Sequence, residues 1–138
     1  MTTVFVDSGG FVALLVAEDA CHERAQALWS QADQEGWTFV TTNTVVVETY
    51  SVLLARSREK RRAALSFLDM LSTDGYRIER VRPADETKAI SLLKAHEDKT
   101  YSLCDALSFT VMDRLKIRRV IAFDRHFREY GRFEVLSA

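Results

Sequence analysis

The sequence predicts an α/β fold with a central, mainly parallel sheet. Short apolar segments rich in β-branched residues alternate with longer segments whose apolar residues recur at helical spacing, which is typical of strands joined by crossover helices. The chain has 138 residues, of which 47% are hydrophobic. That length and that apolar content suit one compact domain with a buried core, so we expect residues 1–138 to form a single domain.

Five short segments are predicted to be strands, because each is apolar or has alternating apolar residues. They cover residues 3–6, 37–40, 76–81, 119–123 and 133–136. The first strand ends at Asp7 and the fourth ends at Asp124. Ligands of parallel α/β sheets bind beyond the carboxyl ends of the strands, so these two acids lie where a site is expected.

The segments between the strands have the apolar periodicity of helices. We expect helices over residues 11–16, 22–34, 45–56, 58–71 and 83–94, a helix that Ser102 caps and that ends near Leu115, and a short turn or helix over 125–130. Gly36 ends the second helix, and the polar run from Thr41 to Thr44 caps the third. Pro83 opens the fifth, since proline is accepted in a first helical turn.

Charge and cysteine content narrow the class of protein. The net charge is −1, so any binding to nucleic acid must come from a local basic patch rather than from a global positive field. Cys21 and Cys104 form neither a disulfide framework nor a zinc pattern, and with no signal peptide a reduced, cytoplasmic setting is expected. No apolar run approaches the length of a membrane span, so no membrane is expected as a partner.

Four carboxylates stand out by their positions. Asp7 and Asp124 follow strands, Glu48 lies on the inner face of a helix, and Asp105 lies near a helix start, where the dipole favours negative charge. Buried acids that lie close together repel one another, and a divalent cation relieves that cost. Oxygen ligands without cysteine or histidine suit Mg²⁺ or Mn²⁺ rather than zinc. Such ions activate water for phosphodiester cleavage, so the hypothesis is a metal-dependent nuclease.

Each of these acids also has a purely structural alternative. Asp7 could cap the following helix, Asp124 could open a turn, and Asp105 could do no more than complement a helix dipole. Glu48 could pair with a buried arginine, for which the candidates are Arg56 and Arg118.

Four segments, which span nearly the whole chain, resemble the motifs of the PIN-domain nucleases in their family order. They are Phe5-Val-Asp7-Ser8, Thr41-Thr-Asn-Thr-Val-Val-Val-Glu48-Thr, Ser102-Leu-Cys-Asp105-Ala-Leu-Ser and Ala122-Phe-Asp124-Arg-His-Phe127. Within that family the sequence is similar to the VapC-like toxins of type II toxin–antitoxin pairs. The resemblance implies a three-layer α/β/α PIN-like domain. It also implies a Mg²⁺- or Mn²⁺-dependent endoribonuclease that cleaves RNA phosphodiester bonds with a metal-activated water.

The resemblance implies catalytic and metal-binding roles for four acids, which are Asp7, Glu48, Asp105 and Asp124. Substrate or supporting roles are expected for five neighbouring residues, which are Ser8, Asn43, Ser102, Arg125 and His126. Some relatives have a further acid where this chain has His126, so we expect one firm metal site and a weaker second one. Gly9 and Gly10 also depart from the pattern, since many relatives have a hydroxyl residue and a small aliphatic residue there.

Two basic clusters could hold RNA phosphates, although a charge run is also typical of a solvated face. One comprises Arg56, Arg58, Lys60, Arg61 and Arg62, and the other comprises Lys116, Arg118, Arg119, Arg125 and Arg128. The resemblance further implies a homodimer and a small antitoxin protein as partners.

Two other classes of function compete with the nuclease. A catalytically degenerate PIN-like binding module would have lost some of the acids, whereas all four are present. A receiver-like signalling domain would have adjacent acids after its first strand and a lysine near the end of a late strand. Here Asp7 stands alone and the late strand leads to Asp124, so the nuclease is favoured.

Overall fold

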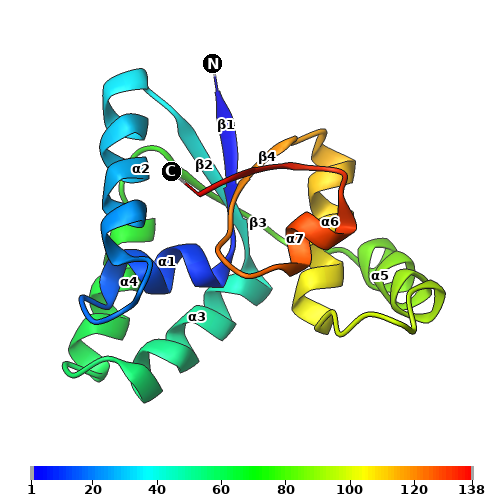
Figure 1. Ribbon diagram of the computed structural model, residues 1–138, viewed down its shortest axis with the longest axis horizontal. Coiled ribbons are helices and arrows are strands. Elements are labelled where there is room, and N and C mark those ends of the chain that lie inside the picture. Colours follow the sequence, from blue (N-terminus) through cyan, green and yellow to red (C-terminus); the bar gives the residue numbers. More distant parts are fainter. Residues whose placement is uncertain (1, 138) are drawn as a thin grey trace.

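The computed structural model describes residues 2–137, which form five strands and seven helices (Figure 1). In chain order they are β1 Thr3–Val6, α1 Ser8–Leu15, α2 His22–Glu35, β2 Thr38–Thr42, α3 Asn43–Arg56, α4 Arg61–Leu71, β3 Tyr76–Glu79, α5 Pro83–Ala95, α6 Leu103–Leu115, β4 Arg119–Ile121, α7 His126–Tyr130 and β5 Glu134–Leu136. The predicted α/β class is confirmed.

All five strands pair in parallel, in the order β3-β2-β1-β4-β5. The chain builds outward from β1 through β2 to β3, then crosses back to place β4 on the other side of β1. The order therefore reverses between β1 and β4, which is where ligands of open α/β sheets bind. Val6 pairs with Ile121, and the Asp7 N–H donates to the Ile121 carbonyl at 3.1 Å, so both strands end together.

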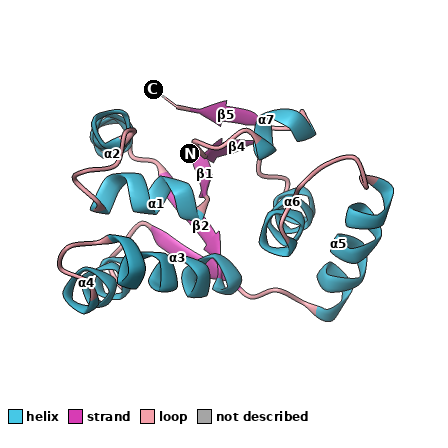
Figure 2. Cartoon of the chain, turned by 60° about the horizontal axis from the view of Figure 1, so that its bottom comes forward, coloured by secondary structure: helices cyan, strands magenta, loops and turns pink. Residues whose placement is uncertain are grey.

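Helices cover both faces of the sheet, which gives the predicted three layers. Figure 2 shows α1 to α4 on one face and α5 and α6 on the other. This division follows from right-handed crossovers, because the connections from β1 to β3 run in one direction and the return to β4 runs in the opposite one. Among the described residues, no helix combines the length and apolar character that a membrane span requires.

Each face of the sheet has its own aromatic core. On one face Phe11 of α1 packs edge-on against Phe67 of α4, with ring centroids 5.0 Å apart. On the other, Phe109 of α6 stacks on Tyr130 of α7 at 4.3 Å and meets Phe127 edge-on at 4.8 Å. Such pairs add to the stability gained from burial. The second core also holds α6 against α7, which carry Asp105 and His126.

The first helix begins three residues earlier than predicted. The segment Ser8-Gly9-Gly10 is helical, although glycine is a poor helix former. A Cβ at Gly10 would lie 3.0 Å from Ile121 Cγ2 and 3.1 Å from Val6 Cγ1. The absence of a side chain therefore lets α1 start directly on the sheet, next to the end of β1.

The second strand is longer than predicted and takes two of the threonines expected to cap a helix. Thr41 and Thr42 pair with Ile78 and Glu79 of β3. Only Thr42 caps α3, since its Oγ1 accepts the Val45 N–H at 3.1 Å. β3 ends at Glu79 rather than residue 81, because its partner β2 ends at Thr42.

Two further boundaries predicted from the sequence are wrong. The helix expected from Arg58 begins at Arg61, because Lys60 has a positive φ of 45° and breaks the helical backbone. β4 ends at Ile121 rather than Phe123, since its neighbour β1 stops at Val6 and no pairing partner remains. Asp124 therefore follows the strand after two residues that lie outside it rather than directly.

An ion-pair network fastens α6 to the edge of the sheet and to α5. Arg114 donates to Glu79 at 2.8 Å and to both carboxylate oxygens of Asp85 at 2.9 and 3.0 Å. Hydrogen bonds from Arg114 lower the pKa of Glu79. Burial alone would raise the pKa of Asp85, but the hydrogen bonds from Arg114 and from the Arg82 N–H outweigh it and the pKa is lowered.

Arg114→Ala is expected to lower the free energy of unfolding at pH 7 by about 3 kcal/mol, because it removes the bidentate partner of the buried Asp85 and leaves Glu79 with only the more exposed Arg77 and Arg82. Folded-state pKa values below the unfolded ones stabilise the protein above about pH 4 and cease to do so as the pH falls through them. The deficit of the variant should therefore shrink in acid, as urea denaturation at pH 7 and pH 3 can measure.

The matched control is Arg56→Ala, which removes a half-exposed arginine paired with Asp19 at 3.1 Å. Exposed pairs contribute little, so a change below about 1 kcal/mol is expected. Equal losses in the two variants would contradict a special role for Arg114.

Candidate active site

Asp7 lies at the carboxyl end of β1 and is almost fully buried, with 2% of its surface exposed. It occupies the N-cap position of α1, yet its side chain makes no capping hydrogen bond. Burial raises the pKa of Asp7 well above its usual range, and the charges of Asp124 and Asp105 raise it further. Glu48 acts in the same direction, while a backbone hydrogen bond from Ser8 opposes it. The helix-capping alternative does not account for this side chain.

Glu48 reaches the same place from α3. Ser8 Oγ donates a hydrogen bond of 2.5 Å to Glu48 Oε1, which ties the first turn of α1 to α3. The alternative that Glu48 pairs with Arg56 is wrong, because Arg56 pairs with Asp19 instead. Arg118 also forms no ion pair with Glu48 in the described part of the chain.

Asp105 enters from the first turn of α6, where it forms a capping box with Ser102. The Asp105 Oδ2 atom accepts the Ser102 N–H at 2.9 Å, and Ser102 Oγ accepts the Asp105 N–H at 3.0 Å. This reciprocal pair holds the carboxylate in one orientation. The predicted cap is present, and among residues 2–137 no hydrogen bond engages the other carboxylate oxygen, Oδ1.

Asp124 and His126 complete the cluster from the loop after β4. Asp124 Oδ1 accepts the His126 N–H at 2.9 Å, so this acid does open a turn, as its structural alternative held. His126 Nδ1 lies 2.7 Å from Asp105 Oδ2, an ion-pair distance without the alignment of a hydrogen bond. One ligand atom each from Asp105, Asp124 and His126 lie within 4.8 Å of one another, a grouping that could hold a metal ion.

Two of the predicted site residues point elsewhere. Asn43 Oδ1 accepts the Val81 N–H at 2.9 Å, so this amide fastens the start of α3 to the segment after β3. Arg125 extends into solvent with 72% of its side chain exposed and lies 3.5 Å from Glu129. Neither side chain joins the acidic cluster.

One residue near the acids escaped the sequence prediction, which treated Cys104 only as a packed residue. Burial raises the pKa of the Cys104 thiol to about 12, and the charges of Glu48 and Asp7 contribute. The thiol is therefore neutral and occupies space between acids without adding charge. Its position directly before Asp105 was the available signal, but only the fold shows that α3 and β1 also approach it.

The donor set fits a divalent cation. Ligand atoms of Asp105, Asp124 and His126 lie within 4.8 Å of one another. Burial raises the pKa of Asp7 beside them, and the charges of Asp124, Asp105 and Glu48 raise it further. Hard oxygen donors of this kind suit Mg²⁺ or Mn²⁺, while the imidazole of His126 favours a softer ion.

Comparison with known proteins places this geometry in a family. The family model for the PIN domain matches residues 4–133. The chain belongs to the PIN-domain family. The 23S rRNA-specific endonuclease VapC20 of Mycobacterium tuberculosis is 34% identical over 132 residues, covering 96% of this chain and 97% of that protein. The predicted PIN-domain, VapC-like relationship is confirmed.

Three solved structures have a similar fold. The crystal structure of M. tuberculosis VapC20, described as a Sarcin-Ricin loop cleaving toxin, gives a TM-score of 0.86 at 33% identity, over 96% of this chain and 98% of that one. VapBC2 from Rickettsia felis, bound to a DNA fragment from its promoter, gives 0.71 at 9% identity over 97% of each chain. FitAcB from Neisseria gonorrhoeae gives 0.65 at 15% identity over 96% of each. These last two support the fold alone.

Asp7→Asn is expected to raise the free energy of unfolding of the metal-free protein at pH 8 by about 1–2 kcal/mol, because an amide adds no charge to this buried, acidic edge. The folded-state pKa of Asp7 is raised, so its ionisation costs stability as the pH rises from about 4 through that pKa. The gain should vanish near pH 3, where Asp7 is protonated in both states. Urea denaturation at the two pH values measures it.

If the acids form a metal site, millimolar Mn²⁺ should stabilise the wild type more than this variant, because a ligand that binds only the folded state raises its stability. Asp98→Asn is the control, since its side chain is 76% exposed and lies outside the cluster. A loss of metal-free stability in Asp7→Asn at pH 8 would show that Asp7 is a structural cap after all.

Proposed function

We propose that the chain acts as a single nuclease domain, a metal-dependent endoribonuclease that serves as the toxin of a toxin–antitoxin pair. The observation that carries the proposal is an acidic cluster at the carboxyl edge of the sheet, where Asp105, Asp124 and His126 lie within ligand distance of one another and the charges of Asp124, Asp105 and Glu48 act on the buried Asp7. The full-length similarity to a 23S rRNA-specific endonuclease supports RNA as the substrate and structured ribosomal RNA as the first substrate to test.

We propose that the four acids bind Mg²⁺ or Mn²⁺. When bound, a divalent cation supplies an activated water and positive charge at the leaving oxygen. The protein contributes the fixed positions of the ligand atoms. Ser8 holds Glu48 through its hydroxyl, and Ser102 orients Asp105 through the capping box. Both serines therefore act as positioning residues for the acids rather than as ligands.

Arg125 retains the proposed role of a substrate contact. Its guanidinium is exposed beside Asp124, and the contact with Glu129 at 3.5 Å is weak enough to exchange for a phosphate. Asn43 supports the site at a distance, since it fixes the first turn of α3, one turn before Glu48.

Asp105→Asn is expected to lower metal-dependent cleavage of ribosomal RNA by at least about a hundredfold, because it removes a charged metal ligand. The asparagine oxygen can still accept the Ser102 N–H, so the helix start should remain capped. Asp113→Asn is the matched control, since it makes the same change at the exposed end of the same helix. Chelation should abolish wild-type cleavage, and added Mn²⁺ should restore it.

Undiminished cleavage by Asp105→Asn would argue against the proposed active site. A wild-type protein that neither cleaves RNA nor binds Mn²⁺ at millimolar concentration would instead fit a degenerate binding module.

We also propose that His126 is a nitrogen ligand that replaces the further acid of some relatives. Its Nδ1 atom lies beside Asp105 and Asp124, and its ring forms a T-shaped contact with that of Tyr101, with centroids 5.7 Å apart. The ring is therefore held in place before a metal binds. An imidazole favours Mn²⁺ over Mg²⁺, so this ligand would set the metal preference.

His126→Ala is expected to weaken Mn²⁺ binding about tenfold and Mg²⁺ binding by less than about threefold, because the lost nitrogen ligand matters more to the softer ion. Calorimetry with each ion measures both constants. His22→Asn serves as the control, since the His22 ring bonds the Ala13 carbonyl away from the cluster. Equal losses for the two ions would reduce His126 to a residue that positions Asp105.

The proposed partners are a second copy of the chain and a small antitoxin, in the cytoplasm. Val47 and Leu103 are apolar yet 68% and 53% exposed, and they lie in the helical turns that carry Glu48 and Asp105. Exposed apolar side chains beside a site are typical of surfaces that a partner covers. The antitoxin is tested by measuring whether the protein encoded by the neighbouring reading frame binds this chain and inhibits its cleavage of RNA. If that protein neither binds nor inhibits, it is not the antitoxin.

A further inference from the structure

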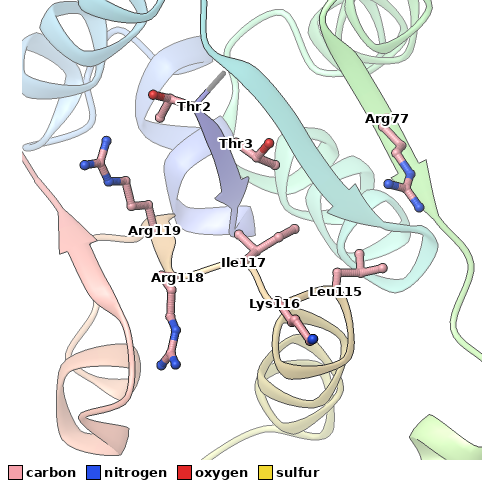
Figure 3. Close-up of a pocket in the computed structure, with 8 residues that line it drawn as sticks. All are labelled: Thr2, Thr3, Arg77, Leu115, Lys116, Ile117, Arg118 and Arg119. Carbon is pink, nitrogen blue, oxygen red and sulfur yellow. The ribbon is translucent and has the colours of Figure 1, made fainter.

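A second site-like feature lies at the opposite edge of the sheet from the acids. A cavity of about 490 Å³ opens where β1 and β4 begin and α6 ends (Figure 3). Its walls carry four cations and two hydroxyls, from Arg77, Lys116, Arg118, Arg119, Thr2 and Thr3. In the view of Figure 3, Thr3 and Ile117 lie between Arg77 on one side and Arg118 and Arg119 on the other.

The charge of this cavity is not balanced from within. Among the described residues no acid lines it. Arg77 and Arg119 pair with Glu79 and Glu134, which lie outside the lining. Lys116 and Arg118 have no acidic partner within 4.0 Å in the part of the chain that the structure describes.

The backbone presents these two free cations together. Lys116 adopts a left-handed conformation with φ of 58°, which ends α6 and turns the chain into β4. Ile117 is then buried while Lys116 and Arg118 on either side of it are exposed. A lysine is costlier than glycine at positive φ, so backbone geometry gives no reason for a cation at this position.

We propose that this cavity is an anion site that binds a phosphate group. Arginine side chains offer paired N–H donors that match phosphate oxygens, a lysine adds a point charge, and threonine hydroxyls complete the donor set. A cavity of this size exceeds what a single carboxylate fills and suits a chain of phosphates.

A structural explanation exists for only part of this cluster. Basic groups near the end of a helix complement its dipole, which would account for Lys116 at the end of α6. It does not account for Arg77, which comes from β3, or for Arg119, which comes from β4. Arg77 is level with Val120 in the register of the sheet, one residue out of step with Arg119, so these two side chains leave opposite faces and border the cavity from either side. The cations that carry the proposal are therefore Lys116 and Arg118, and Arg118 lies beyond the end of the helix.

The phosphate could belong to RNA or to a free polyphosphate. α6 carries Asp105 in its first turn and is followed by Lys116, and 11 residues of helix span about 17 Å. A folded RNA held at the acids could place a second part of its backbone over that distance. The anion site itself does not rest on the proposed nuclease activity, because phosphate binding needs neither the acids nor a metal.

The test is calorimetric titration of the metal-free full chain with inorganic tripolyphosphate at low salt. The variant Lys116→Gly with Arg118→Gln removes both free cations and allows the positive φ without strain, so its melting temperature should match the wild type. Binding should weaken about tenfold or more. Arg80→Gln with Lys94→Gln is the control, because it removes two exposed cations without ion pairs among the described residues, outside both basic clusters, and causes the same change in net charge.

The single change Arg118→Gln, which leaves the backbone turn untouched, should weaken binding in the same direction. No tripolyphosphate binding by the wild type, or equal losses in the test and control pairs, would overturn the proposal.

A second arm identifies the source of the phosphate by measuring binding of a structured ribosomal RNA fragment in EDTA, so that cleavage plays no part. If the RNA backbone occupies the cavity, the Lys116→Gly, Arg118→Gln variant should bind RNA more weakly and lower the slope of log affinity against log salt by about 1.5. If RNA binding is unchanged while tripolyphosphate binding is lost, the ligand is a free polyphosphate. Both outcomes support the phosphate site.

Discussion

The structure is organised around the repulsion between carboxylates at the carboxyl edge of the sheet. Asp7 is buried there within the field of Asp105, Asp124 and Glu48, which raises its pKa. A folded chain tolerates such a cost only if other contacts supply the stability. Here the two aromatic cores and the Arg114 network do so from outside the site. Asp7 can therefore remain buried without an ion-pair partner among the described residues, and carboxylates with free oxygens are what a divalent cation requires.

Strand order explains why acids so distant in sequence meet. β4 is added beside β1 only after the chain has completed β2 and β3 on the other side. The end of β4 thus comes next to the end of β1, and α3 and α6 direct their first turns toward the same edge. Each acid comes from a different element, so a movement of any one helix would change the arrangement of the ligands. The capping box at Asp105 therefore stabilises the start of α6 and also fixes the position of a proposed metal ligand.

The sequence predicted most of this architecture because β-strands and helices leave local signals. β1, α2, α5 and α6 were set by apolar periodicity and by caps such as Ser102. The errors arose where the end of an element depends on a neighbouring strand or on one backbone angle. β4 ends at Ile121 because its pairing partner β1 ends at Val6. α4 begins only at Arg61 because Lys60 has a positive φ. Single-chain patterns do not contain that information.

The sequence also predicts the acids of the site better than it predicts the contacts that surround them. The acids could be identified from strand ends and family motifs. The contact between His126 and Asp105 could not, since it depends on α7 packing against α6 through Phe109 and Tyr130. The sequence also could not predict that the Asn43 side chain points away from the site, where its Oδ1 atom accepts the Val81 N–H. Residue type and motif predict which groups are present, whereas packing decides which of them are free to bind.

A net charge of −1 conceals two opposite poles. The site acids lie at the carboxyl edge of the sheet, and the cavity with Lys116 and Arg118 lies at the opposite edge. α6 illustrates this arrangement, with Asp105 at its start and Lys116 just past its end, each complementary to the helix dipole. A metal at the first edge and a phosphate at the second would both be attracted by local fields that the total charge does not reveal. For a polyanion such as RNA, the second pole can offset the repulsion exerted by the first, so that the overall charge of the protein is a poor guide to its substrate.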